Sequence, residues 1–330
     1  MLRITHDTPI PNTFHIPAKA ATFVTYGRED IEELTTFLQS EGKGRRILNI
    51  GQGSNLLFLK DFDGIVLASD VRDFSVSGNR LRVGAAWVVD ELIERTLALG
   101  LYGLENLSLI PGTVGAAAVQ NIGAYGVEIA NFIREVEALE LKTGTIRIFR
   151  PEELHYGYRR SFFKAPEEWG RWAVLSVTLE LSHDFVPRLD YGGLRQRLGE
   201  GSVSARQVRE AVIAIRREKL PDPQVLGNAG SFFVNPVVPR EKAEELRRQY
   251  PDMPTYEAEN GVKIPAGWMI EQCGWKGRAL GPAAVHDRQA LVLVNRGGAT
   301  GEDISRLSEA VRAAVKERFG VDVRPEVNFL

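Results

Sequence analysis

Apolar and polar positions change in short blocks along the first third of the chain, as in a protein of mixed helices and strands. Residues 31–38 carry apolar side chains at helical spacing, and Asp30 stands where such a helix is capped. A second helical stripe covers 88–97 and closes at Gly100. Around these helices the sequence predicts strands at 46–50, 64–68 and 81–85.

Two further strand patterns stand in the middle of the chain. In 173–181 every second residue is apolar, which predicts a half-buried strand. Residues 135–141 and 145–149 flank a Thr143-Gly144 turn and predict a hairpin. Strands mixed with helices, without one long βαβ rhythm, favour an α+β fold in several lobes over one doubly wound sheet.

Helix signals divide the second half of the chain. Ser204 and Gln207 form a capping box, and the helix that they open ends before Pro221, where we place a domain boundary. Apolar positions in 304–319 predict a last helix with Gly320 at its end. A length of 330 residues agrees with two or three domains.

Composition narrows the class of partner and compartment. The chain has 41 basic and 43 acidic residues, so a net charge of -2 gives no argument for nucleic acid or an anionic membrane surface. The single cysteine, Cys273, excludes a disulfide within the chain and favours a reducing compartment. The five histidines do not fall at metal-ligand spacing, so no metal site is expected. Without a signal-peptide pattern or a run of ~18 apolar residues, we expect a cytoplasmic protein with no membrane span.

Two glycine-rich segments are candidate binding loops. Gly51-Gln52-Gly53-Ser54-Asn55 follows a predicted strand and could bind phosphate through its backbone N–H groups, or could simply be a tight turn. It is not a dinucleotide fingerprint, because Leu56 replaces the third glycine. In 111–126, small residues would let a ligand approach the main chain, with side-chain hydrogen bonds from Gln120 and Asn121; close helix packing is the alternative. Two such segments favour one extended cofactor that bridges two lobes.

Three polar residues suggest proton chemistry on an anionic substrate. Ser231 lies in the bare stretch 227–236, Arg159 lies among tyrosines and phenylalanines in 156–164, and Glu326 follows Pro325 near the C-terminus. Taken singly, each is more typical of a turn serine or a surface charge. A Ser-His-Asp triad finds little support, because the chain has no Gly-x-Ser-x-Gly elbow and two phenylalanines follow Ser231.

Taken together, the ordered motifs resemble the UDP-N-acetylenolpyruvoylglucosamine reductases, flavoenzymes of bacterial peptidoglycan precursor synthesis. Tyr191-Gly192-Gly193-Leu194 resembles the mobile tyrosine loop of the longer subclass of this family. The resemblance spans nearly the whole chain and rests on segments 12–14, 51–57, 111–115, 120–126, 156–161, 216–223, 227–236, 264–268, 286–290 and 324–327.

The resemblance implies a three-lobed α+β fold. Residues 1–70 would form a first FAD-binding lobe of the vanillyl-alcohol-oxidase/PCMH type. Residues 71–220, joined by the C-terminal tail 318–330, would form the second, and residues 221–317 would form a substrate-binding lobe. The implied FAD contacts are Gly51, Gln52, Gly53, Ser54, Asn55, Leu56, Pro111, Gly112, Gly115, Gln120, Asn121, Gly123, Ala124 and Tyr125.

The same resemblance implies a mechanism. NADPH would reduce FAD, and the reduced flavin would deliver a hydride to the enolpyruvyl group of the UDP-sugar. Ser231 would donate the proton to the α-carbon, while Arg159 and Glu326 would polarise the substrate carboxylate. The implied substrate contacts are Tyr191, Lys219, Asn235 and Gln289.

Two other functions stay open on the sequence. One is a flavin oxidase or dehydrogenase of the same cofactor fold with another substrate, against which the Ser231 and Glu326 segments together argue. The other is a sugar-nucleotide or flavin sensor. Beyond the UDP-sugar and NADPH, the sequence predicts no obligate protein partner.

Overall fold

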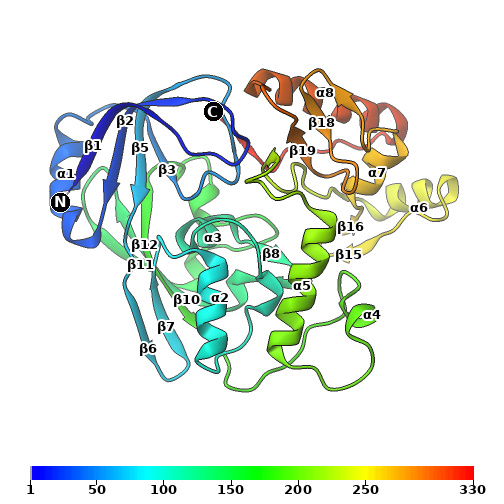
Figure 1. The fold of residues 1–330 in the computed structure, drawn as a ribbon, viewed down its shortest axis with the longest axis horizontal. Coiled ribbons are helices and arrows are strands. Elements are labelled where there is room, and N and C mark those ends of the chain that lie inside the picture. The colour runs from blue at the N-terminus through cyan, green and yellow to red at the C-terminus, as the bar shows by residue number, and fades with distance from the viewer. Residues whose placement is uncertain (1) are drawn as a thin grey trace. The chain divides into compact units, whose positions relative to one another are not determined.

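The computed structural model of the protein describes residues 2–330, and its contacts divide them into two compact units. Unit 1 contains the chain up to Pro9 together with Lys19–Gln52 and Phe62–Arg216. Unit 2 contains Ile10–Ala18, Gly53–Asp61 and Arg217–Leu330. The chain therefore passes between the units several times (Figure 1).

Unit 1 contains a mixed sheet and an antiparallel sheet. In the mixed sheet, of order β1-β2-β5-β3, β1 and β2 are antiparallel and β5 is parallel to both of its neighbours. The antiparallel sheet has the order β11-β10-β12-β7-β6, and its strands confirm the hairpin and the strands predicted at these positions. The bounds are β1 Arg3–Pro9, β2 Lys19–Tyr26, β3 Ile47–Ile50, β5 Phe62–Ser69, β6 Phe74–Ser77, β7 Arg80–Gly84, β10 Ile133–Glu140, β11 Ile146–Phe149 and β12 Trp172–Glu180.

The central strand β12 is buried on both faces for most of its length, so the prediction of a half-buried strand was wrong. A β-bulge shifts the register between β10 and β12 beside Glu137 and Ala138. Such a bulge turns the side chains that follow it to the other face. As a result, Val174 and Val177 share one apolar cluster with α2 (Val89–Ala98) and α3 (Val114–Gln120), while Leu175 joins a second cluster with β2 and β5.

The helices of unit 1 begin and end close to the predicted positions. The capping box is confirmed, because Ser204 N donates to Gln207 Oε1 at 2.8 Å and Gln207 N donates to Ser204 Oγ at 3.3 Å. Asp30 is the N-cap residue of α1, as predicted, but its carboxylate makes no cap hydrogen bond to α1 and instead accepts from Gly27 N at 2.9 Å, at the start of a 3-10 turn. The helices are α1 Ile31–Gln39, α2 Val89–Ala98, α3 Val114–Gln120, α4 Leu194–Leu198 and α5 Ala205–Lys219, the last of which ends in unit 2; short 3-10 helices are η1 Arg28–Asp30, η2 Glu105–Leu107, η3 Ile129–Asn131, η4 Pro151–Glu153 and η5 Phe162–Lys164.

Unit 2 packs three helices with small antiparallel sheets of order β13-β19-β18-β17 and β14-β16-β15. The last helix is confirmed: Thr300 Oγ1 accepts from Asp303 N at 3.2 Å at its start, and Gly320 ends it with a φ of 65°. The bounds are β13 Gly227–Asn228, β14 Val237–Val238, α6 Arg240–Gln249, β15 Tyr256–Ala258, β16 Gly261–Lys263, α7 Ala266–Gln272, β17 Ala279–Leu280, β18 Ala283–Val285, β19 Leu293–Asn295 and α8 Gly301–Phe319.

The C-terminal tail belongs to unit 2. Strand β20 (Asn328–Phe329) pairs in parallel with β4 (Leu56–Leu57), and Leu59 N donates to the carbonyl of Leu330 at 2.9 Å. The sequence joined this tail, 318–330, to residues 71–220, whereas the contacts group it with 53–61 and 217–317. The division into three lobes itself stays a prediction.

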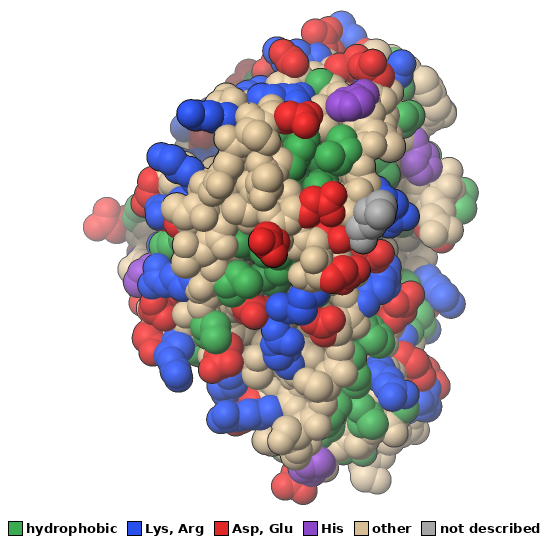
Figure 2. Space-filling view, turned by 90° about the vertical axis from the view of Figure 1, so that its left-hand side faces the viewer, with side chains coloured by type: hydrophobic (Ala, Val, Ile, Leu, Met, Phe, Trp, Pro, Cys, Tyr) green, Lys and Arg blue, Asp and Glu red, His purple; other side chains and the backbone are tan. Residues whose placement is uncertain are grey.

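Charged side chains, apolar helices and groups able to bind a metal ion are features of the molecule that bear on its binding partners. Figure 2 shows acidic and basic side chains interspersed over one face, as the balanced charge leads one to expect. Within residues 2–330 no helix is long and apolar enough to cross a bilayer, and no group of three acidic, histidine or cysteine side chains is placed to hold a metal ion. Cys273 is partly buried, and burial raises the pKa of its thiol.

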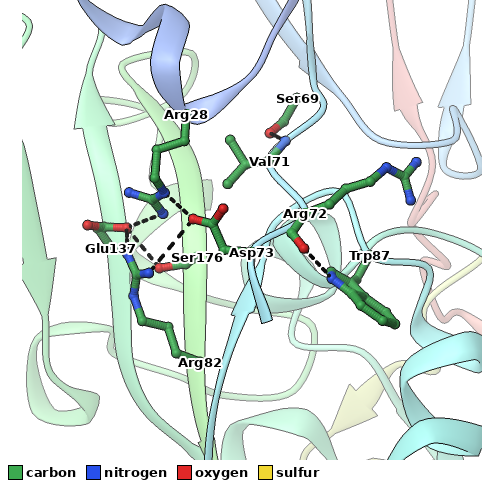
Figure 3. A network of polar contacts seen from close by, with 9 residues as sticks. All are labelled: Arg28, Ser69, Val71, Arg72, Asp73, Arg82, Trp87, Glu137 and Ser176. Atoms are coloured by element: carbon green, nitrogen blue, oxygen red, sulfur yellow. Dashed lines mark hydrogen bonds and ion pairs between the residues drawn. The ribbon is translucent and has the colours of Figure 1, made fainter. Parts of the chain in front are cut away.

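A polar network around Glu137 links the two sheets of unit 1 (Figure 3). Arg28, which follows β2, bonds to Asp73 and, at 2.7 Å, to the carboxylate of Glu137 on β10. Arg82 and Ser176 also donate to Glu137, at 2.7 and 2.8 Å. Burial raises the pKa of Glu137, but the hydrogen bonds from Arg28 and Ser176 and the nearby guanidinium groups outweigh burial and hold this pKa below its usual value.

Glu137→Gln should lower the free energy of unfolding by about 2–3 kcal/mol at neutral pH, because Arg28 and Arg82 lose their shared charged acceptor. A carboxylate whose pKa is lower in the folded chain stabilises the fold above its unfolded pKa, and this contribution is lost as the pH falls through the folded pKa. Wild type and variant should therefore differ above about pH 5 and converge below about pH 4 in denaturant titrations.

Glu135→Gln is the matched control, because Glu135 lies on the same strand and its side chain has no hydrogen bond or ion pair within residues 2–330. Its stability should stay within about 0.5 kcal/mol of wild type at every pH. Equal losses in both variants would contradict the role of the network.

Candidate active site

The glycines of the first two candidate loops allow main-chain segments of unit 1 to approach closely. A Cβ at Gly51 would lie 2.7 Å from Thr113 Oγ1, and a Cβ at Gly115 would lie 2.8 Å from the Cβ of Ala85. Gln52 Oε1 accepts from Gly112 N at 2.8 Å, so the two segments hold each other. Gly112 has a φ of 122°, which other residues rarely adopt. Close packing, the alternative given above, thus explains Gly51 and Gly115 without a ligand.

Asn121 has a structural side chain rather than one offered to a ligand. It is fully buried, its Nδ2 donates to Glu128 Oε2 at 2.8 Å and to Gly157 O at 2.9 Å, and its Oδ1 accepts from Ala130 N at 3.2 Å. The expectation of a side-chain hydrogen bond from Asn121 to a ligand was therefore wrong. Its backbone, with a φ of 49°, ends α3 in the left-handed conformation.

Residues 156–164 dock on the carbonyl end of α3. Tyr156 OH donates to Ala118 O at 3.0 Å, and Ser161 Oγ donates to Val119 O at 2.6 Å. Lys164 Nζ donates to Gln120 Oε1 at 2.6 Å. The last carbonyls of a helix have no partner within the helix, so these side chains satisfy groups that would otherwise lose their hydrogen bonds on burial.

Arg159 stands at the tip of a tight turn in this segment. Gly157 and Arg160 exchange backbone hydrogen bonds of 3.1 and 2.9 Å, and Arg159 between them has a φ of 55°. A positive φ in a residue with a side chain marks local strain, which proteins often retain at functional sites. Arg159 Nη2 donates to Gly123 O at 2.9 Å, so the structure places Arg159 beside the predicted cofactor residues of unit 1.

The predicted tyrosine loop lies on the turn that joins β8 (Gly123–Ala124) to β9 (Val127–Glu128). Tyr125 and Gly126 form this turn with φ values of 49° and 79°, as in a type I′ hairpin. A Cβ on Gly192 would lie 2.4 Å from the ring of Tyr125, and Tyr191 itself is 39% exposed. The loop can lie so close to the ring only because residue 192 is glycine.

In unit 2 the structure brings Ser231 and Glu326 together. The backbone of 232–234 pairs with that of 324–326: Glu326 N donates to Phe232 O at 2.8 Å and Val234 N donates to Arg324 O at 2.9 Å. Ser231 is exposed, and its hydroxyl makes no hydrogen bond within residues 2–330. The carbonyl of Glu326 accepts from Asn55 Nδ2 at 3.3 Å, which ties a third predicted segment to the same pair.

The predicted substrate residues of unit 2 are only partly gathered. Asn235 Oδ1 accepts from Ala266 N at 2.9 Å, and a Cβ on Gly267 would lie 3.1 Å from Gln289 Oε1, so both amides lie against the first turn of α7. Lys219 is exposed at the end of α5. Ser54 precedes strand β4, and Leu56 is the first residue of that strand and is buried.

Two buried polar atoms within the described part of the chain lack a hydrogen-bond partner, and neither residue was singled out from the sequence. They are Thr13 Oγ1 in unit 2 and Arg216 Nε in unit 1. Arg216 stood only as the first residue of the block 216–223. Its burial depends on how α5 packs, which no local pattern reveals.

Comparison with known proteins identifies the family. A model of the UDP-N-acetylenolpyruvoylglucosamine reductase C-terminal domain matches residues 222–330. Proteins named UDP-N-acetylenolpyruvoylglucosamine reductase are similar over nearly their whole length. The Bacteroides fragilis protein is 51% identical over 326 residues, with 97% of each chain covered. The Porphyromonas gingivalis protein is 44% identical over 340 residues, with 99% of each covered. The chain belongs to the UDP-N-acetylenolpyruvoylglucosamine reductase family.

The fold and the cofactor of this reductase family member follow from two further matches. A model of the FAD binding domain matches residues 28–150, which confirms FAD as predicted. The crystal structure of the Thermus caldophilus UDP-N-acetylenolpyruvylglucosamine reductase superposes with a TM-score of 0.70 at 23% identity, covering 100% of this chain and 99% of that one. It therefore has the same fold, and the predicted α+β class with an FAD-binding fold is confirmed.

Gly192→Ala should displace the tyrosine loop, because the added methyl group would clash with the Tyr125 ring. We expect a loss of about 1–3 kcal/mol in the free energy of unfolding and faster limited proteolysis within 183–203. Gly193→Ala is the control: Gly193 has a similar φ, 80° against 73°, but its nearest atom to an added Cβ lies at 3.8 Å. If both variants lose equal stability, the backbone conformation rather than the ring contact determines the effect.

Proposed function

We propose that this protein reduces the enolpyruvyl group of UDP-N-acetylglucosamine enolpyruvate to form UDP-N-acetylmuramate, with FAD as cofactor and NADPH as hydride donor, in peptidoglycan precursor synthesis. Family membership over nearly the full chain supports the proposal. The observation that carries it is the pairing of the Ser231 segment with the Glu326 segment. This reduction requires a group that donates a proton to the α-carbon and a group that interacts with the substrate carboxylate, and Ser231 and Glu326 would supply them.

The residues of unit 1 fit FAD. An arginine nitrogen, Arg216 Nε, is buried without a partner, and an anionic cofactor would supply one. The main-chain turns at 111–115 and 123–126 would hold the cofactor together with Gly51 and Gln52. When bound by these residues, FAD would supply the hydride-transfer chemistry that links NADPH to the β-carbon of the enol ether. The protein's own part is to bind, orient and protonate.

Ser231 is proposed as the proton donor to the α-carbon. Its hydroxyl is exposed and has no hydrogen bond within residues 2–330, so it is available to a substrate. A serine hydroxyl is a weak acid, and it can donate here because hydride addition to the β-carbon leaves a strongly basic α-carbon. Gly230, with a φ of 67° and open space where a Cβ would stand, leaves the approach to this hydroxyl uncrowded.

Arg159 and Glu326 are proposed to stabilise charge on the substrate carboxylate. The guanidinium of Arg159 can grip a carboxylate through two N–H groups, and its turn fixes the side chain against Gly123. Glu326 would act in its protonated form, since only a protonated carboxyl group donates to another carboxylate. We further propose Tyr191, Lys219, Asn235 and Gln289 as contacts of the sugar nucleotide.

The reaction itself is tested with purified, FAD-loaded protein. NADPH oxidation should require the enolpyruvyl UDP-sugar and yield UDP-N-acetylmuramate. Rapid NADPH oxidation that needs only oxygen would instead favour the flavin oxidase alternative.

Ser231→Ala should retain FAD and its reduction by NADPH but lower kcat by about 10²–10⁴, because only the protonation of the substrate is lost. Stopped-flow absorbance of the flavin separates the two half-reactions. Ser305→Ala on α8 is the control, with unchanged turnover expected. Turnover within twofold of wild type in Ser231→Ala would rule out the proposed role.

A further inference from the structure

Arg216 lies on the same face of α5 as Arg209, beyond the residues of α5 that form ion pairs with α2. Arg209, two turns earlier on the same face, donates to both oxygens of Asp90 at 2.6 and 3.0 Å and to Glu94 at 2.9 Å. Arg206 pairs with Glu94 at 3.1 Å, so the later residue of α5 meets the earlier residue of α2 and the helices run antiparallel. Towards its C-terminal end, α5 therefore passes the start of α2 (Figure 1).

The glycine-rich segment 111–126 starts beside the first turn of α2. Leu109 N donates to Asp90 Oδ1 at 2.7 Å, and Val89 N donates to Gly112 O at 3.1 Å. Tyr125, at the other end of that segment, packs on the apolar cluster of α5. Arg216 interacts electrostatically with both Tyr125 and Asp90, so its guanidinium lies in the neighbourhood of both residues.

This guanidinium lacks any partner in the described residues. Arg216 makes no hydrogen bond or ion pair within residues 2–330, and its Nε is buried. Asp90 acts on Arg216 only through the electrostatic interaction, because its carboxylate makes its hydrogen bonds to Arg209 and Leu109 instead. Burial lowers the pKa of Arg216, with Tyr125 and Asp90 opposing the shift, yet arginine stays charged in proteins. Arg216 as a whole is half-buried, but a charged donor nitrogen that is buried without an acceptor is costly and points to a missing counter-charge.

We propose that Arg216 binds an anionic oxygen of a diphosphate. The planar guanidinium group of arginine can donate two parallel hydrogen bonds to phosphate oxygens, and burial strengthens this ion pair. The inference rests on the proposed function, in which both FAD and the UDP-sugar carry a diphosphate. Because Arg216 lies near the segment 111–126, the diphosphate of FAD is the favoured ligand. Arg216 itself lies outside residues 28–150, the span matched by the FAD binding domain model.

The test compares Arg216→Gln with Arg217→Gln, which removes the same charge from the exposed neighbouring residue. Apoprotein is titrated with FAD at low and high salt, and its melting temperature is measured without ligand. For Arg216→Gln we expect at least a tenfold higher Kd for FAD, a weaker salt dependence and an apoprotein melting temperature equal to or above that of wild type. Arg217→Gln should match wild type in all three, and Arg216→Lys should recover part of the affinity.

A second titration, of FAD-loaded protein with UDP, distinguishes the two sources of diphosphate. Unchanged FAD affinity with at least tenfold weaker UDP binding in Arg216→Gln would assign the residue to the sugar nucleotide and still support the proposal. Unchanged affinity for both ligands overturns it, as does a lower apoprotein melting temperature with unchanged affinities, which indicates a purely structural role. Neither titration requires turnover, so failure of the proposed reaction would be seen separately.

Discussion

The backbone pairing between 232–234 and 324–326 is the constraint on which the proposed chemistry of unit 2 depends. It fixes a serine and a glutamate from distant parts of the chain within one short ladder. Apolar burial holds that ladder in place: Phe232 and Phe233 are almost wholly buried, and Phe232 meets the rings of Phe14 and Phe329 at 6.1 and 6.0 Å. Each buried ring contributes about 2–3 kcal/mol, more than a single backbone hydrogen bond. The aromatic pair after Ser231 thus anchors the segment while the serine stays exposed.

In unit 1 the corresponding constraint is the C-terminal end of α3, where the last carbonyl groups have no hydrogen-bond partner within the helix. Because Tyr156, Ser161 and Arg159 donate to carbonyls at or just beyond this end, the helix, the β8–β9 turn and the arginine turn form one connected structure. Asn121 completes it from within. The residues proposed to meet FAD and substrate are thereby held on a support whose polar groups are mutually satisfied. Arg216 is the exception: its Nε is buried without a hydrogen-bond partner, as expected of a site that becomes complete only with its proposed ligand.

Local patterns were reliable where burial and capping are decided within one element. The strands at 47–50 and 80–84, the capping box of Ser204 and Gln207, and the last helix ending at Gly320 follow from short-range periodicity and cap chemistry. Patterns failed where a neighbour decided the outcome. The bulge between β10 and β12 reassigned side chains to the other face, and the side chain of Asp30, the N-cap residue of α1, bonded to Gly27 N rather than to a backbone N–H of the helix. Neither competitor is visible in the residues of the element itself.

By itself the sequence determined the family, the α+β class, the FAD cofactor and the identity of the candidate acid, cation and carboxylate, because ordered motifs and side-chain chemistry are written in the residues. Only the tertiary structure decided that the C-terminal tail packs with 53–61 and the Ser231 segment, that the Asn121 side chain makes internal hydrogen bonds, and that Arg216 Nε is buried without a hydrogen-bond partner. The reason is physical: partners across a fold are chosen by which apolar faces bury one another, and that choice depends on contacts far apart in the chain.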